Sequence, residues 1–203
     1  MIYSITCFFL RIACRILFKC KIYGVENIPR KGSFIVAPNH VSHLDPIAVG
    51  VFVRRKYIYL AKKELFKNRF WGWYLRKLRI IPIDREKSPY SGMKETIRKI
   101  KNGDPLVIFP EGTRSDGKSF LEPETGAAYL ALKFNLPVVP VYVKGTEKAL
   151  PKGAHFIQLT PIKVYYGKPK RYQMPAEGDR YEAYKKVSRS IMEEIRELKN
   201  RYG

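Results

Sequence analysis

The sequence alternates between short apolar segments and segments with the periodicity of amphipathic helices. Apolar runs typical of buried strands lie at residues 33–37, 57–61, 80–83, 106–109, 138–143 and 162–166. Helical patterns lie between or after them, at residues 46–53, 64–77, 93–100, 125–134 and from 179 onwards. Strands that are apolar along their whole length and separated by helices are typical of a sheet covered on both faces. In a chain of 203 residues we therefore expect one α/β domain, with a central mixed or largely parallel sheet flanked by helices.

The first strand candidate leads into a turn that carries a histidine and an aspartate. Pro46 is well placed as the first residue of a helix, so Asp45 is expected to be the N-cap. The same carboxylate can accept the Nδ1 proton of His40, which leaves Nε2 as a general base of fixed tautomer. The spacing alone is unspecific, because a histidine followed five residues later by an aspartate occurs by chance in many proteins.

Other chemistry at this turn is disfavoured. No cysteine lies near His40, His43 and Asp45, and they lack a third ligand elsewhere, which argues against zinc. Ser42 lacks the G-x-S-x-G context of a serine nucleophile. Direct attack by the hydroxyl of an acceptor molecule is simpler than a covalent intermediate.

A second motif, residues 109–114, follows another strand candidate. Gly112 is expected to let backbone amides approach an anion, and Arg114 can bind a phosphate through two hydrogen bonds. The alternative is an ordinary polar turn in which Glu111 pairs with Arg114. Lys62-Lys63 and Asp84-Arg85 follow two further strands. Because ligands bind at the carboxyl ends of parallel strands, these segments together predict an anion site.

The net charge of +21, from 39 basic and 18 acidic residues, predicts an anionic partner, either nucleic acid or an anionic membrane. Most of the excess lies in the first 85 residues. The three cysteines all lie within the first twenty residues and do not form a disulfide framework, which fits a reducing compartment.

The N-terminal segment favours the membrane. Residues 1–21 predict an amphipathic helix whose uncharged stretch, residues 1–10, is too short to span a bilayer, since a spanning helix needs about 20 apolar residues. Its apolar face carries Ile2, Ile5, Phe9, Ile12 and Ile16, and Arg11, Arg15 and Lys19 lie roughly opposite. This pattern is typical of a helix that lies in the membrane interface, although a first helix packed on the core is the alternative.

Residues 66–77 add aromatic side chains interleaved with lysines and arginines, a composition that suits the headgroup level of a bilayer. We therefore expect a membrane-associating helix at 1–21 and a globular domain at 22–203. The expected partner is an anionic membrane surface rather than nucleic acid. The expected location is the cytoplasmic face of the cell membrane, as a peripheral or monotopic protein.

Four segments together resemble a known family. They are Asn39-His40-x-Ser42-x-x-Asp45, Ile83-Asp84-Arg85, Phe109-Pro110-Glu111-Gly112-Thr113-Arg114 and Val138-Val139-Pro140-Val141. In this order they resemble the blocks of the glycerolipid acyltransferases, and most of all those of the bacterial 1-acylglycerol-3-phosphate (lysophosphatidate) acyltransferases. The resemblance extends over about residues 22–170. Arg79 stands where the family pattern has a glycine.

The resemblance implies that His40 deprotonates the sn-2 hydroxyl of lysophosphatidate and that Asp45 orients His40. It implies that the glycerol phosphate is bound by Arg85, Glu111, Gly112, Thr113 and Arg114, with help from Lys62. It also implies that no metal or prosthetic group is needed, and that acyl-CoA or acyl carrier protein donates the acyl group. The product of this reaction is phosphatidate, an intermediate of phospholipid biosynthesis.

Two alternatives stay open. Within the same enzyme class, the acceptor is glycerol 3-phosphate, dihydroxyacetone phosphate or a lysophospholipid. From another class, the chain is a basic module that binds anionic lipid or nucleic acid without catalysis. The net charge favours the second alternative, but charge alone does not explain two ordered motifs at strand ends.

Overall fold

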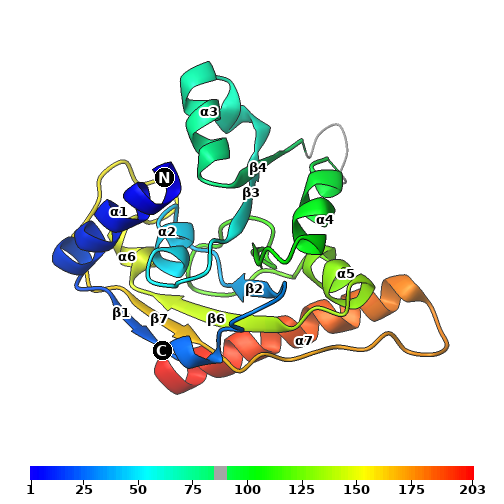
Figure 1. Cartoon of the computed structure of the whole chain (residues 1–203). Coiled ribbons are helices and arrows are strands. Elements are labelled where there is room, and N and C mark those ends of the chain that lie inside the picture. The colour runs from blue at the N-terminus through cyan, green and yellow to red at the C-terminus, as the bar shows by residue number, and fades with distance from the viewer. Residues whose placement is uncertain (85–90) are drawn as a thin grey trace.

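The computed structural model describes residues 1–84 and 91–203, which form a seven-stranded sheet (Figure 1). The strand order is β1-β7-β6-β2-β5-β3-β4, and every neighbouring pair is parallel except β6 with β7. The strands span Lys21–Tyr23 (β1), Ile35–Pro38 (β2), Ile58–Lys62 (β3), Ile80–Ile83 (β4), Leu106–Val107 (β5), Val138–Lys144 (β6) and Lys163–Tyr166 (β7). The expected α/β fold with a mixed, largely parallel sheet is confirmed.

Helices cover both faces of this sheet (Figure 1). They span Ile2–Phe18 (α1), Asp45–Gly50 (α2), Arg69–Lys77 (α3), Met93–Lys101 (α4), Gly126–Lys133 (α5), Thr146–Ala149 (α6) and Arg180–Tyr202 (α7), with 3-10 turns at Val25–Asn27 (η1) and Lys63–Phe66 (η2). One face of the sheet packs against α1, α2 and α6, and the other packs against α4, α5 and α7.

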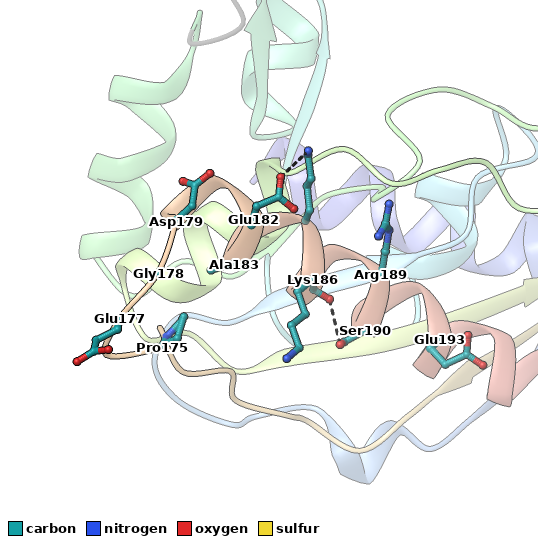
Figure 2. Close-up of a pocket in the computed structure, with 11 residues that line it drawn as sticks. Pro175, Glu177, Gly178, Asp179, Glu182, Ala183, Lys186, Arg189, Ser190 and Glu193 are labelled. Atoms are coloured by element: carbon teal, nitrogen blue, oxygen red, sulfur yellow. Dashed lines mark hydrogen bonds and ion pairs between the residues drawn. The ribbon is translucent and has the colours of Figure 1, made fainter.

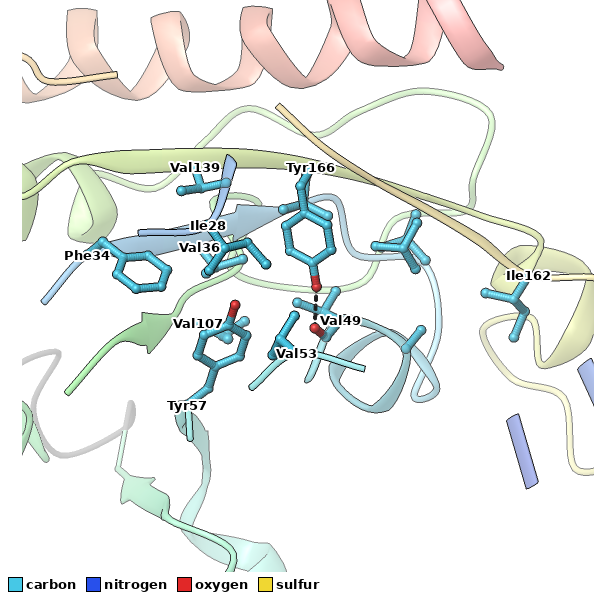
Figure 3. Packing of buried hydrophobic residues seen from close by; sticks show 14 of the residues in the cluster. Ile28, Phe34, Val36, Val49, Val53, Tyr57, Val107, Val139, Ile162 and Tyr166 are labelled. Atoms are coloured by element: carbon cyan, nitrogen blue, oxygen red, sulfur yellow. Dashed lines mark hydrogen bonds between the residues drawn. The ribbon is translucent and has the colours of Figure 1, made fainter. Parts of the chain in front are cut away.

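Consecutive residues of the central strands point to opposite faces, so each strand contributes to two cores. In β2, Val36 packs in the core beside α2, whereas Ile35 and Ala37 pack in the core beside α5 and α7. Figure 3 shows the first core, in which the hydroxyl of Tyr166 donates a hydrogen bond to the carbonyl of Val49 in α2. Because β2 is buried on both faces, the turn that follows it starts from a fixed position.

Some elements differ from the sequence predictions. The helix expected at 64–77 is divided into η2 and α3, because the side chain of Asn68 accepts the amide of Trp71 at 3.0 Å and starts a new helix. The strand β1 and the helix α6 were not predicted, because three or four residues are too few to establish a period.

The predicted N-terminal helix is present as α1. Its carboxyl-terminal end is packed on the domain, where Cys14 and Phe18 are buried. Ile5, Phe9 and Ile16, by contrast, have 48%, 64% and 70% of their surface exposed. Part of the apolar face is therefore uncovered.

The predicted cationic stripe of α1 is wrong at one residue. Nε of Arg11 donates to the carbonyl of Val51 at 2.9 Å, so this arginine binds the end of α2 instead of facing outward. No helix among the described residues is long and apolar enough to cross a membrane. The division at residues 21 and 22 stays a prediction.

Candidate active site

The two sequence motifs meet at the carboxyl ends of β2 and β5, which are neighbouring strands. The residues 39–45 form the turn after β2, and the residues 109–115 form the loop after β5. The amide of His40 donates to Oε1 of Glu111 at 2.7 Å, and the amide of Ser115 donates to the carbonyl of His40 at 2.8 Å. The expected convergence of the two motifs at one edge of the sheet is therefore present.

His40 and Asp45 form the expected pair. Nδ1 of His40 lies 2.9 Å from Oδ2 of Asp45, and the carboxylate side chain is 0% exposed. Because a carboxylate oxygen only accepts hydrogen bonds, Nδ1 is the donor of this bond, and in the neutral imidazole Nε2 then keeps its lone pair. The side chain of His40 is 17% exposed, so the imidazole can be reached from the surface. This geometry is that of an oriented general base.

The prediction that Asp45 caps α2 is wrong. Asp45 is the first residue of the helix, and the N-cap position belongs to Leu44. Oδ2 of Asp45 instead accepts the amides of Val41 and Ser42, at 2.7 and 2.8 Å, because the preceding turn folds back over the carboxylate. Together with the bond from His40, three hydrogen bonds hold this oxygen in place.

One face of the imidazole is covered by an aromatic ring. The centroids of the His40 and Phe109 rings are 4.0 Å apart and the two planes are inclined by 25°. Phe109 is partly buried and packs against the core beside α2, so the ring it presents to His40 has a fixed position. A substrate therefore approaches His40 from the ring edge or from the face opposite Phe109.

Glu111 lies inside the site. It does not pair with Arg114, so the alternative of an ordinary polar turn with a Glu111–Arg114 pair is not what the structure shows. Its side chain is buried, with only 3% of the residue exposed. Oε1 accepts the amide of His40, and Oε2 accepts the amide of Leu121 at 3.0 Å. Burial raises the pKa of Glu111, and these two amide donors oppose that shift. Glu111 thus joins the turn after β2 to the loop after β5.

Gly112 adopts a left-handed conformation, with φ of 67°, and a Cβ built on it meets Cγ of Glu124 at 2.7 Å. The amide of Gly112 donates to the carbonyl of Phe109 at 3.0 Å, and the amide of Thr113 donates to the carbonyl of Glu111 at 2.7 Å. These two amides close the turn, and the role of Gly112 in letting backbone amides approach an anion stays a prediction. A cationic side chain on the same loop can also bind an anion.

Arg114 supplies such a side chain beside the histidine turn. It is partly buried, and its backbone carbonyl accepts a hydrogen bond from Nζ of Lys152 at 2.9 Å. Burial lowers the pKa of His43, the positive charge of Arg114 lowers it further, and the carboxylate of Asp45 opposes the shift. The guanidinium of Arg114 therefore lies close enough to His43 to act on it, and the loop that carries Arg114 is hydrogen-bonded to the turn of His40.

The remaining predicted cations lie farther along the same edge of the sheet or outside the described residues. Lys62 is exposed at the end of β3, the strand beside β5. Nζ of Lys63 binds Oδ2 of Asp84 at 2.7 Å, which joins the ends of β3 and β4. Arg85 lies outside the described residues, so its predicted role stays a prediction.

Two buried residues of the turn support the site and were not predicted to do so. Nδ2 of Asn39 donates to the carbonyl of Val143 at 3.1 Å, and the amide of Val143 donates to Oδ1 of Asn39 at 2.7 Å. The Ser42 hydroxyl donates to the carbonyl of Leu150 at 2.8 Å. The position of Asn39 directly after an apolar strand was the only signal for its role. Ser42 is fully buried, which agrees with the argument against a serine nucleophile.

An open groove lies along the first turns of α7, between that helix and residues 175–179, at a distance in the sequence from the site (Figure 2). Its lining mixes acidic and basic side chains and includes none of the predicted site residues. Among the described residues, no three histidine, cysteine, aspartate or glutamate side chains gather in a way that could hold a metal ion.

Comparisons with known proteins agree on one family. The model of the acyltransferase family matches residues 19–144. A 1-acyl-sn-glycerol-3-phosphate acyltransferase of Bacillus subtilis is 31% identical over 182 residues, which cover 89% of this chain and 88% of the relative. The enzyme of that name from Helicobacter pylori is 33% identical, over 90% of this chain and 68% of the relative. The crystal structure of a 1-acyl-sn-glycerophosphate (LPA) acyltransferase from Thermotoga maritima is similar with a TM-score of 0.79 and 29% identity, over 99% of this chain and 81% of that one.

Proposed function

Because the chain belongs to the acyltransferase family, we propose that it transfers a fatty acyl group from a thioester to the sn-2 hydroxyl of lysophosphatidate, forming phosphatidate. The names of the relatives from Bacillus subtilis and Helicobacter pylori support this acceptor. The observation that carries the proposal is the buried carboxylate of Asp45, which binds Nδ1 of His40 in a turn that is hydrogen-bonded to the loop of Arg114.

The hydrogen bonds at His40 suit direct transfer to the acceptor. Nε2 of His40 takes the proton of the sn-2 hydroxyl as its oxygen attacks the thioester carbonyl, and the carboxylate of Asp45 stabilises the imidazolium that forms. A carbon–oxygen bond forms, the carbon–sulfur bond breaks, and the imidazolium returns the proton to the leaving thiolate. The stacked ring of Phe109 keeps the imidazole in one plane during both proton transfers.

The phosphate of the acceptor is proposed to bind Arg114, with the exposed hydroxyl of Thr113 beside it. An arginine can hold a phosphate through two parallel hydrogen bonds, which fixes the orientation of the glycerol as well as its position. Lys62 at the end of β3, and Arg85, are the further cations proposed for this anion. Glu111 orders the loop that carries Thr113 and Arg114.

The proposed acceptor, lysophosphatidate, and the product, phosphatidate, are lipids, so we propose that the chain acts at an anionic membrane surface on the cytoplasmic side. Support comes from the uncovered apolar face of α1 and from α3, in which Phe70, Trp71 and Trp73 are 71%, 48% and 46% exposed. The hydroxyls of Thr6 in α1 and Tyr74 in α3 are hydrogen-bonded at 2.9 Å, which brings the two helices together. The proposed acyl donor is acyl-CoA or acyl carrier protein.

A panel of acceptors tests the reaction. The purified chain, in vesicles and in detergent, is given an acyl-CoA or an acyl carrier protein thioester. The acceptors are lysophosphatidate, monoacylglycerol, glycerol 3-phosphate, dihydroxyacetone phosphate and a lysophospholipid with a larger headgroup. We expect the highest kcat/KM with lysophosphatidate and a value at least about tenfold lower with monoacylglycerol, which lacks the charge that Arg114 binds. An equal kcat/KM with monoacylglycerol and with lysophosphatidate would contradict the proposed anion site.

A further inference from the structure

The loop between α6 and β7, residues 151–161, exposes three large apolar side chains close together in the sequence. Phe156 is 86% exposed, Ile157 is 54% exposed and Leu159 is 66% exposed. Among the described residues, every large apolar side chain that is more than 60% exposed lies in this loop, in α3, or in α1 and the methionine before it. Soluble surfaces rarely gather apolar side chains in this way unless another apolar phase covers them.

The 151–161 loop is tied at one end to α1. The amide of Ile162 donates to the carbonyl of Phe18, the last residue of α1, at 2.9 Å. The amide of Lys21 in turn donates to the carbonyl of Ile162 at 2.9 Å, and both Phe18 and Ile162 are buried in the same core. Figure 1 shows α1 and α6 on the same side of the sheet, opposite α7. The loop therefore leaves the core beside the helix with the uncovered apolar face.

The other end of the loop is tied to the candidate active site. The hydroxyl of Ser42 donates to the carbonyl of Leu150, and Nζ of Lys152 donates to the carbonyl of Arg114. Within the loop, the amide of Gln158 donates to the carbonyl of Ala149 at 2.7 Å, which folds the apolar residues back toward this end. The loop thus connects the turn of His40 with the end of α1.

The charge around the loop suits an anionic lipid surface. Residues 148–163 contain three lysines, Lys148, Lys152 and Lys163, and no acidic residue. In an anionic bilayer, the apolar side chains in the middle of this segment can contact acyl chains, and the lysines before and after them can bind the anionic headgroups. A second protein surface would have to supply both an apolar patch and negative charge.

We propose that the 151–161 loop is a membrane-contacting element in addition to α1 and α3, with Phe156, Ile157 and Leu159 inserted into an anionic lipid bilayer. The inference rests on the proposal that the chain works at a lipid surface, and it adds which segment meets the lipid next to the site. Because the loop is hydrogen-bonded to Arg114 and Ser42, its insertion holds the opening of the site at the level of the headgroups.

A single-tryptophan variant tests the insertion. The chain has two tryptophans, Trp71 and Trp73, so Trp71→Phe and Trp73→Phe combined with Phe156→Trp leave one reporter in the loop. The matched control carries Tyr181→Trp instead of Phe156→Trp, because Tyr181 is 54% exposed at the start of α7 (Figure 1). Both variants are added to vesicles of anionic phospholipid with brominated acyl chains, and binding is measured in parallel by co-sedimentation.

We expect the emission of the tryptophan at 156 to shift to the blue and to be quenched by the brominated lipid, and that at 181 to do neither. In the otherwise native chain, Phe156→Ser with Ile157→Ser and Leu159→Ser should weaken vesicle binding at least about tenfold. The unfolding temperature should stay unchanged, because all three side chains are exposed.

Bound protein with an unquenched tryptophan at 156 would overturn the inference while leaving the reaction standing. A blue shift that needs no vesicles and grows with protein concentration would assign the loop to contact between copies, and would overturn it as well. Conversely, quenching at 156 without phosphatidate formation would leave the inference intact and remove the proposed function.

Discussion

Asp45→Asn separates the structural role of the buried carboxylate from its chemical role. In the native chain, Oδ2 of Asp45 accepts hydrogen bonds from Nδ1 of His40 and from the amides of Val41 and Ser42. Asparagine keeps one oxygen acceptor but loses the charge, and its NH₂ group replaces Oδ1. Oδ1 of Asp45 is buried, and it has no hydrogen-bond partner among the described residues.

The cost follows from these contacts. A hydrogen bond to a charged group contributes about 1.5–3 kcal/mol and a neutral one about 1 kcal/mol, so two weakened amide bonds remove about 1–4 kcal/mol. An unpaired buried NH₂ removes a further 1–3 kcal/mol or so. The free energy of unfolding should therefore fall by about 2–7 kcal/mol. Turnover should fall by about two to four orders of magnitude, because the uncharged asparagine does not stabilise the imidazolium that forms at His40.

Urea unfolding gives the first quantity, and phosphatidate formation under conditions where the variant is folded gives the second. Asp116→Asn is the matched control, since Asp116 lies in the neighbouring loop and its exposed carboxylate accepts only local amides. The control should change neither quantity appreciably. If Asp45→Asn kept both native stability and native turnover, the structural and chemical roles assigned to the carboxylate of Asp45 would be refuted.

Three further substitutions probe the rest of the site. Arg114→Ala should raise the KM for lysophosphatidate about 10- to 100-fold with little change in kcat. The control Arg98→Ala, on the exposed side of α4, should change neither KM nor kcat. An unchanged KM in Arg114→Ala would remove Arg114 from the phosphate site. Phe109→Leu should lower kcat about 2- to 10-fold at unchanged KM because it removes the ring stacked on His40, and a native kcat would show that stacking does not position the imidazole. Burial raises the pKa of Glu111 above its ordinary value of 4.5, so the native state binds this proton more tightly than the unfolded state does. The resulting stability is present below about pH 4.5 and is lost as the pH rises through the folded-state pKa of Glu111. Glu111→Gln should flatten that fall in urea unfolding measured at several pH values, and a pH dependence parallel to that of the native chain would contradict the assignment.

The fold was predictable because its central strands are buried on both faces. Residues 34–37 and 138–143 carry almost only apolar side chains, and a strand of this kind requires helices on both sides of the sheet. The meeting of the two motifs was predictable for the same reason, since parallel strands place their carboxyl ends at one edge. By contrast, the pairing of β1 with β7, in which Lys21 lies opposite Lys163, was not predictable. The three residues of β1 are too few to form a pattern that indicates a partner so far along the chain.

The details of the site depend on contacts that the sequence does not encode locally. Asp45 was expected to cap a helix, but the position of its carboxylate is set by the turn that folds back onto it. Glu111 was expected among the ligands of the phosphate, and only the packing of β2 beside β5 turns it toward the amide of His40. Arg79, at a position where the family pattern has a glycine, adopts φ of 65°, the left-handed conformation that glycine adopts without strain.

Replacement of His40 by alanine is the most direct test of the mechanism. The native chain and His40→Ala are bound to the same anionic vesicles, and phosphatidate formation from lysophosphatidate and an acyl thioester is measured over one turnover. We predict that vesicle binding and lysophosphatidate binding stay near the native level, while the rate constant of acyl transfer falls by about three orders of magnitude or more. A rate constant within tenfold of the native value would contradict the assignment of His40 as the general base.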